Sequence, residues 1–180
     1  MTSTQIPIRP ATPEDARAIA HAQVETWKTA YRGIIADDFL DTFSVDERTD
    51  RWTEVLQRPE QGSFVAEIDD ALIGFANGGP ERDGHENFKG ELYGLYVFPD
   101  WHGQGVGKRL VTTFADRLLG SGIATMLVWT LADNPYRRFY ERLGGKIVAE
   151  RDIEIGEQKL TEVAYGWDEV ATLLGTENAS

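Results

Sequence analysis

The sequence predicts a mixed α/β (α+β) fold, in which helices flank a mostly antiparallel central sheet of about seven strands. Three observations lead to this fold class. Short apolar segments typical of strands follow one another in antiparallel runs. Helical periodicity is confined to the stretches between them. One glycine-rich turn joins a buried strand to a helix and then to a second buried strand, which predicts a single right-handed crossover. The expected order is β-α-α-β-β-β-α-β-α-β-β.

The first half of the chain is expected to form a short strand, two helices and a hairpin. Thr12-Pro13-Glu14-Asp15 is typical of a helix start, because a hydroxyl cap precedes a proline and two acids. Ser44 followed by Glu47 indicates a second helix start, and Asp69-Asp70 between two apolar stretches indicates a tight turn. The expected elements are a strand at 6–8, a helix that Gly33 ends, a helix at 45–56, and hairpin strands at 63–68 and 71–77.

The second half is expected to supply the buried strands. The run 92–98 is apolar on both faces, which predicts a central strand covered on both sides. Asn134-Pro135 is expected to cap a short helix that Gly144 ends. The remaining expected elements are a polar loop at 78–87, a helix from 106 to 120, and strands at 123–130, 146–155 and 158–167. Residues 1–175 are expected to form a single domain, followed by a polar tail at 176–180.

Composition narrows the function classes. The 180 residues include 18 Lys and Arg, 30 Asp and Glu and no cysteine, and the formal net charge is −12. This charge argues against nucleic-acid binding, which needs a basic face, and the lack of thiols excludes cysteine nucleophiles and disulfides. No His or carboxylate spacing indicates a metal. No apolar run reaches the roughly 18 residues of a membrane helix, and no signal peptide is recognised, so we expect a cytoplasmic protein without membrane partners.

The turn from His102 to Lys108 is the strongest functional signal. It has a glycine at every second position and joins a buried strand to a helix. At such a position free backbone N–H groups and the positive helix end bind phosphate. The turn is not a dinucleotide fingerprint, since its third glycine comes one residue early, and it is not a P-loop, since His102 and Arg109 occupy the places of a glycine and a hydroxyl. An ordinary tight turn without a ligand is the structural alternative.

Gly94 interrupts an otherwise apolar strand, which indicates a bulge. A bulge here would part this strand from the strand that begins at Ile123. The backbone groups exposed in the resulting slot could pair with an amide-containing ligand arm. Pyrophosphate at one end and amides along the slot together describe coenzyme A.

Three segments carry a family resemblance. Val97-Phe98-Pro99 and the glycine turn after it resemble the coenzyme A signature of the GCN5-related N-acetyltransferase (GNAT) superfamily, [Gln/Arg]-x-x-Gly-x-[Gly/Ala] after a V-x-P strand end. Asn134 with Phe139-Tyr140 is similar to the second signature, and the opening Ile8-Arg9-Pro10 resembles the first strand. The resemblance spans nearly the whole chain and implies a GNAT-like fold with acetyl-CoA as cosubstrate. His102 replaces the usual Gln or Arg, which leaves open whether this side chain contacts coenzyme A.

The resemblance also implies roles for individual residues. Tyr140 matches the general acid that protonates the departing thiolate, and a phenol with a pKa of about 10 is protonated at neutral pH. Val97 matches the residue whose N–H stabilises the thioester carbonyl. Core packing is the alternative for Tyr140, and helix capping can coexist with cofactor contact at Asn134. The residues implied to bind the cofactor are Leu95, Tyr96, Val97, His102, Gly103, Gln104, Gly105, Val106, Gly107, Lys108 and Asn134.

The acceptor side is less well defined. Glu91, at the entry to the buried strand, is the preferred general base, directly or through a water. Trp27 and Tyr31 resemble residues that line the acceptor site in one GNAT subgroup, although core packing of Trp27 is an equal alternative. The competing candidates for the base are Glu25, His85 and Glu86.

These residues predict an N-acetyltransferase that moves an acetyl group from acetyl-CoA directly to an amine, in a ternary complex without an acyl-enzyme. Acids at 37–47 and 81–86 are expected to border the acceptor side and favour a small cationic amine, while Lys108, Arg109, Arg137 and Arg138 are expected near the cofactor. A non-catalytic acyl-CoA-binding or sensor module and an acetyltransferase of protein amino groups stay open as alternatives. A homodimer, the acyl-chain preference and the identity of the amine also stay open.

Overall fold

A computed structural model describes residues 6–175, so the tail expected at 176–180 lies outside the described residues. Seven strands form one sheet in the order β1-β2-β3-β4-β5-β7-β6. Every neighbouring pair is antiparallel except β4 and β5, which are parallel. The mixed, mostly antiparallel sheet is therefore confirmed. The strands are β1 (Ile8–Pro10), β2 (Gly62–Ile68), β3 (Ala71–Pro80), β4 (Gly90–Val97), β5 (Met126–Leu131), β6 (Lys146–Ile155) and β7 (Gln158–Trp167).

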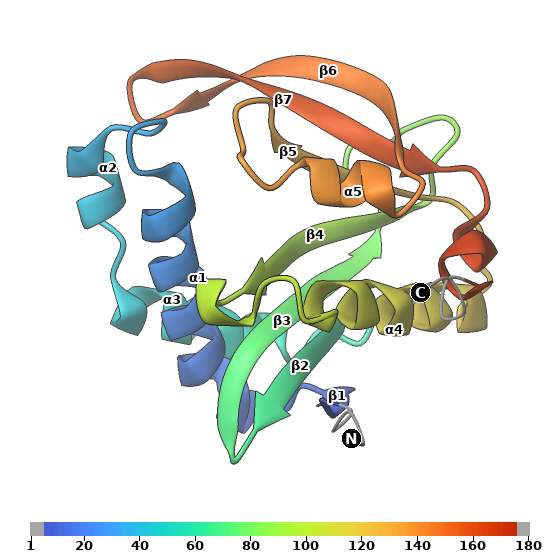
Figure 1. The fold of residues 1–180 in the computed structure, drawn as a ribbon, viewed down its shortest axis with the longest axis horizontal. Helices are drawn as coiled ribbons and strands as arrows, with labels where there is room; N and C mark the ends of the chain where they lie inside the picture. The colour runs from blue at the N-terminus through green and yellow to red at the C-terminus, as the bar shows by residue number, and fades with distance from the viewer. Residues whose placement is uncertain (1–5, 176–180) are drawn as a thin grey trace.

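Helices cover both faces of the sheet. In Figure 1 the three helices α1, α2 and α3 lie together at the left, and α4 lies at the lower right. We name the two faces of the sheet after α1 and α4. None of the helices within residues 6–175 is both long and apolar enough to cross a membrane. The helices are α1 (Ala16–Tyr31), α2 (Asp37–Asp41), α3 (Val45–Val55), α4 (Val106–Gly120) and α5 (Arg138–Arg142), with short 3-10 turns at Pro13–Asp15, Pro99–Trp101 and Val170–Leu173.

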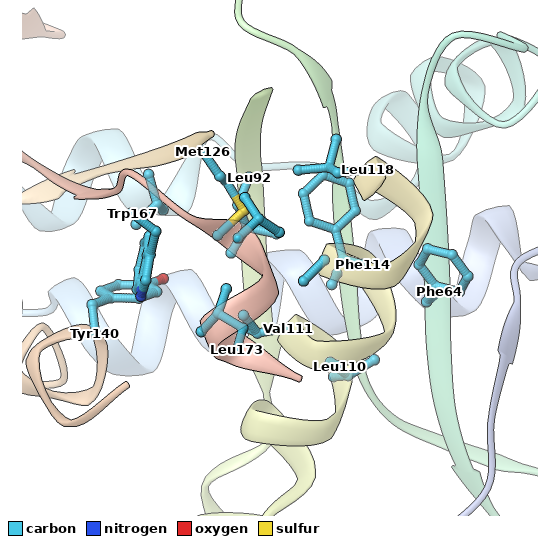
Figure 2. Close-up of a cluster of buried hydrophobic side chains, with 14 of the residues drawn as sticks. Phe64, Leu92, Leu110, Val111, Phe114, Leu118, Met126, Tyr140, Trp167 and Leu173 are labelled. Carbon is cyan, nitrogen blue, oxygen red and sulfur yellow. The ribbon is translucent and has the colours of Figure 1, made fainter. Parts of the chain in front are cut away.

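The larger core fills the α4 face. Leu110, Val111 and Phe114 recur at helical spacing, so they lie on one side of α4 and are completely buried. They meet Leu92 of β4 and Met126 of β5, as Figure 2 shows. Because α4 is fixed to both central strands in this way, its N-terminus is held beside the C-terminal end of β4.

Several elements differ from the sequence prediction, among them β1 and β4, which are shifted by two residues at their starts. The short helix α2 was not predicted, because five residues are too few to show helical periodicity. Strand β3 continues to Pro80, where a loop was expected. A Cβ at Gly78 would lie 2.3 Å from the Phe114 ring, so this glycine permits close packing rather than a turn. Strand β5 begins at Met126 because Ile123 still belongs to the turn that ends α4, where its N–H donates to the Leu118 carbonyl.

Candidate active site

Strand β4 carries the bulge that Gly94 indicated. Asn77 of β3 pairs with Gly94, whereas the next residue, Gly78, pairs with Leu92. Tyr93 is therefore the extra residue, one position before the glycine. A bulge of this kind bends the strand and increases its local twist.

The central strands separate just before the bulge. β4 pairs with β5 at two positions only, Gly90 with Met126 and Glu91 with Leu127. Phe98 donates its N–H to the Ile73 carbonyl on the β3 side. Successive N–H groups of a strand point to opposite sides, so the N–H of Val97 points away from β3 and into the gap. The parting of the two strands confirms the expected slot.

A cavity of about 480 Å³ occupies this gap, a size typical of a ligand site. Two of the expected residues are absent from its wall, Gln104 and Glu91. The Gln104 side-chain amide instead donates to the Asp100 carbonyl at 2.9 Å. The expected residues that do line the cavity are Trp27, Tyr31, Leu95, Tyr96, Val97, His102, Gly103, Gly105, Val106, Gly107, Lys108, Asn134 and Tyr140.

The glycine turn presents backbone donors to the cavity. Gly103 and Gly105 have φ values of 74° and 79°, a left-handed conformation that glycine adopts without strain. No side chain caps α4, and its first intrahelical bond runs from Arg109 to the Gly105 carbonyl. The N–H groups of Val106 and Gly107 therefore have no intrahelical acceptor. With the positive end of a 15-residue helix behind them, they form a site for an anion.

The basic residues near the turn differ in part from the expected four. Lys108 and Arg138 line the cavity as expected. Arg109 instead bonds the Ile6 carbonyl, and Arg137 lies 3.5 Å from the Tyr165 hydroxyl. Arg142 lines the cavity but was not predicted, although its spacing of four residues from Arg138 puts both on one side of α5.

The cavity wall is locally basic although the protein carries a net charge of −12. No carboxylate is among the described residues that line it. Three aromatic side chains of the wall, Trp101, Tyr136 and Phe139, were also not predicted as site residues. The Tyr136 ring contacts the His102 ring edge-on at 4.8 Å. His102 Nε2 is 2.8 Å from the Val97 carbonyl oxygen, so this imidazole ties the end of β4 to the glycine turn.

Tyr140 joins the core to the cavity. Its side chain is packed beside Trp167, as Figure 2 shows, and only 8% of the residue is exposed. Burial raises the pKa of its phenol above the ordinary value. The hydroxyl has no hydrogen-bond partner among residues 6–175. Core packing and proton donation are therefore compatible at this residue, because the ring is buried and a protonated hydroxyl is left for a ligand.

Helix α1 brings two aromatic residues to the same cavity. Trp27 Nε1 donates to the Tyr96 hydroxyl at 2.9 Å. The Asn134 side-chain amide donates to the Tyr31 hydroxyl at 3.1 Å, and its oxygen accepts the Tyr136 N–H at 2.8 Å. Asn134 thus caps the segment before α5 and positions Tyr31, two functions that its amide serves at once.

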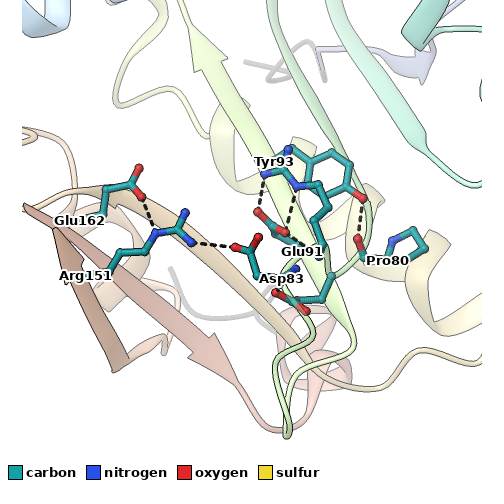
Figure 3. Close-up of polar contacts among 8 residues, drawn as sticks. Pro80, Asp83, Glu91, Tyr93, Arg151 and Glu162 are labelled. Carbon is teal, nitrogen blue, oxygen red and sulfur yellow. Dashed lines mark hydrogen bonds and ion pairs between the residues drawn. The ribbon is translucent and has the colours of Figure 1, made fainter. Parts of the chain in front are cut away.

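Glu91 lies on the α1 face rather than in the cavity wall. Leu92 packs against α4, and neighbouring strand residues point to opposite faces, so Glu91 points to the α1 face of the sheet. Its carboxylate is buried against Arg82, with Nη2 at 2.5 Å from Oε1 and Nε at 3.1 Å from Oε2 (Figure 3). Glu91 and Tyr96 are five positions apart, an odd spacing that would put them on opposite faces of a regular strand, so only the bulge at Tyr93 puts them on the same face.

The other candidates for the general base do not line the cavity either. Glu25 and Glu86 are exposed, and His85 Nδ1 accepts the N–H groups of Asn87 and Phe88. Among residues 6–175, none of the candidates for the general base therefore lines the cavity. His102 of the glycine turn is the imidazole in its wall.

Four of the eight acids expected to border the acceptor side are paired with arginines in the described part of the chain. Arg151 bridges Asp83 at 2.7 Å and Glu162 at 2.9 Å, which ties the loop after β3 to the β6–β7 hairpin (Figure 3). Because these acids are neutralised outside the cavity, net charge alone does not define the acceptor. The further pairs are Arg32 with Asp37 and Asp41, and Arg17 with Asp46.

Buried phenols predict a loss of stability at alkaline pH. Burial raises the pKa of Tyr31 and Tyr140, and that of Tyr93 to about 12. Their pKa in the unfolded chain is about 10, so their contribution is complete below pH 10 and is lost as pH rises through the folded-state pKa. We expect the urea midpoint to fall between pH 10 and 12, and to fall less in Tyr93→Phe. Tyr136→Phe, at an exposed tyrosine, is the control. If the urea midpoint falls equally with pH in the unmodified protein and in both variants, the prediction is contradicted.

Comparison with known proteins identifies the family. The model of the acetyltransferase (GNAT) family matches residues 28–145, which include the glycine turn, the slot and Tyr140. The chain belongs to this family. An uncharacterised N-acetyltransferase of Bacillus subtilis, YuaI, is 36% identical over 169 residues, which are 93% of this chain and 96% of YuaI. This GNAT acyltransferase is thus similar to YuaI over nearly its full length.

Solved structures of other proteins share the fold of this GNAT acyltransferase. The PaiA N-acetyltransferase of Thermoplasma acidophilum, in complex with coenzyme A, superimposes with a TM-score of 0.68 at 22% identity and covers 88% of this chain and 98% of its own. The acetyltransferase yncA of Salmonella typhimurium, with acetyl-CoA, has a TM-score of 0.70 at 22% identity and covers 98% of both chains. At this identity the likeness shows the fold.

Proposed function

We propose that this GNAT acyltransferase transfers an acetyl group from acetyl-CoA to a small amine by direct attack in a ternary complex. The observation that carries the proposal is the slot, in which the free edge of β4 ends at the N-terminus of α4. The donors of the glycine turn fit a pyrophosphate and the strand edge fits an amide-containing arm. The coenzyme A in the PaiA structure and the acetyl-CoA in the yncA structure support the same cosubstrate.

The proposed reaction assigns each step to a group of the site. The amine lone pair attacks the thioester carbonyl carbon, a C–N bond forms, and the Val97 N–H stabilises the negative oxygen of the tetrahedral intermediate. The C–S bond then breaks, and the Tyr140 hydroxyl gives its proton to the thiolate sulfur. Before the attack, the base receives one proton from the ammonium group of the acceptor. The second proton, which the tetrahedral nitrogen loses as the amide forms, returns through water to the phenolate.

We propose that Glu91 is this base and acts through a water, because its carboxylate shares the α1 face with Tyr96 but does not reach the cavity wall. Glu91→Gln is expected to lower kcat by about 10²-fold or more, the lower range for general base catalysis, and to remove the acidic limb of the pH–rate profile. A structural role alone would lower stability and leave the shape of that profile intact. Glu86→Gln is the control, and an acidic limb that persists in Glu91→Gln would contradict the role.

Thiol release from acetyl-CoA tests the proposed function. Small amines, amino acids, polyamines, aminoglycosides and peptides would serve as acceptors, and binding of acetyl-CoA would be measured by calorimetry. We expect acetyl-CoA binding and turnover with at least one small amine. Binding without thiol release would indicate an acyl-CoA-binding or sensor module, and turnover with peptides alone would indicate an acetyltransferase of protein amino groups.

A further inference from the structure

A half-buried arginine without a counter-ion lies beside the acceptor side of the cavity. Arg48, on the first turns of α3, holds its guanidinium carbon 4.6 Å from the centroid of the Phe43 ring. Its side chain forms no hydrogen bond or ion pair with any of residues 6–175. Two other arginines of this region are paired with acids, Arg17 with Asp46 and Arg32 with Asp37. Arg48 is therefore a cation whose partner the described chain does not supply.

The surroundings of Arg48 connect it to the cavity. Arg48 lines a small hollow together with Gln23, Val24, Trp27 and Phe43. Trp27 also lines the main cavity, where its indole N–H binds the Tyr96 hydroxyl at 2.9 Å. One aromatic side chain thus separates the guanidinium from the space in which an acceptor would lie.

The charges around Arg48 leave it uncompensated. Burial lowers the pKa of its guanidinium, and the neighbouring cation Arg51 acts in the same direction. The Tyr96 phenol and Glu47 act in the opposite direction, as weaker contributions. A cation that has lost part of its hydration without gaining a counter-ion costs free energy, which a bound anion would offset.

We propose that the acceptor amine also carries a carboxylate, and that Arg48 binds it and so determines the class of acceptor. This inference rests on the proposed function. A guanidinium forms paired hydrogen bonds with a carboxylate. The acceptor would extend from the Val97 N–H and the Tyr140 hydroxyl, across Trp27, to Arg48. The ammonium group of such an acceptor agrees with the cationic amine expected from the sequence, and its carboxylate adds a negative charge.

Matched pairs of acceptors test the inference. We would measure thiol release from acetyl-CoA with 4-aminobutanoate and propylamine, and with phenylalanine and 2-phenylethylamine. One hydrogen-bonded charge pair contributes about 1.5–3 kcal/mol, which corresponds to about 10- to 100-fold. We therefore expect kcat/KM to be at least about tenfold higher for the carboxylate of at least one pair. Equal or better turnover of both decarboxylated amines would overturn the inference.

Arg48→Met separates charge recognition from packing, because methionine keeps an apolar stem over Phe43. We expect it to raise KM for the carboxylate acceptor by about 10- to 100-fold, to leave kcat/KM for the decarboxylated amine unchanged, and to be rescued in part by Arg48→Lys. Arg58→Met, which removes an exposed charge just after the same helix, is the control and should change neither value. Comparing variants on one acceptor cancels differences in amine basicity.

The outcomes distinguish this inference from the proposed function. Equal losses for both acceptors in Arg48→Met would show a structural role and overturn the inference. Turnover of decarboxylated amines alone would also overturn it and would leave the proposed acetyl transfer standing. Acetyl-CoA binding without thiol release from any amine would overturn the proposed function itself. If Arg48→Met fails to fold, the acceptor pairs in the unmodified enzyme still decide the question.

Discussion

Replacing Tyr140 by phenylalanine is expected to lower kcat by about 10²- to 10⁴-fold, the usual contribution of a positioned proton donor. The ring stays in the core against Trp167, and only the hydroxyl that faces the cavity is lost. Because burial raises the pKa of this phenol, the unmodified enzyme keeps its donor protonated throughout the neutral range. The effect should therefore be seen in kcat, while the affinity for acetyl-CoA, measured by calorimetry, stays the same.

Tyr165→Phe is the matched control for this change. Tyr165 lies in the same aromatic cluster, with its ring centroid 5.7 Å from that of Tyr140. Its hydroxyl donates to Glu141 Oε1 at 2.8 Å and does not line the cavity. A loss of kcat in Tyr140→Phe but not in Tyr165→Phe supports proton donation. Equal kcat values in all three proteins would assign Tyr140 to the core alone.

Replacing Gly105 by valine is expected to weaken acetyl-CoA binding by about 100-fold or more, as the loss of two hydrogen bonds to a charged group predicts. Gly105 has a φ of 79° at the cap of α4, where a β-branched residue is strained. Relief of that strain turns the N–H groups of Val106 and Gly107 away from their common target. Calorimetric titration with acetyl-CoA measures the loss directly.

Gly122→Val is the control for backbone strain. Gly122 has a φ of 78° at the other end of α4, and no atom lies within 4 Å of the Cβ that a substitution would add. Both variants should lose stability to a similar extent because the strain is similar. Only Gly105→Val should lose acetyl-CoA affinity, and an equal loss of affinity in Gly122→Val would refute the anion site at the glycine turn.

Much of the fold could be predicted because its signals are local. Ser44 accepts the Glu47 N–H at the start of α3, as the capping pattern predicted. The bounds of β6 and β7 match the expected strands, since alternating side chains in an edge pair are visible in the sequence. Gly78 shows where this approach fails. A glycine predicts a turn by its conformational freedom, but here its missing side chain admits the Phe114 ring, a contact between residues far apart in the chain.

The features of the site also fall into two groups, those with a local signal and those that depend on tertiary contacts. The sequence by itself determined the glycine turn, the bulge and the slot, because each depends on backbone geometry that neighbouring residues impose. The tertiary structure alone decided that Glu91 is held by Arg82 on the α1 face, and that Arg48 reaches Trp27 without a counter-ion. Pairing and burial of charged side chains depend on which distant elements the sheet brings together, and no local pattern encodes that.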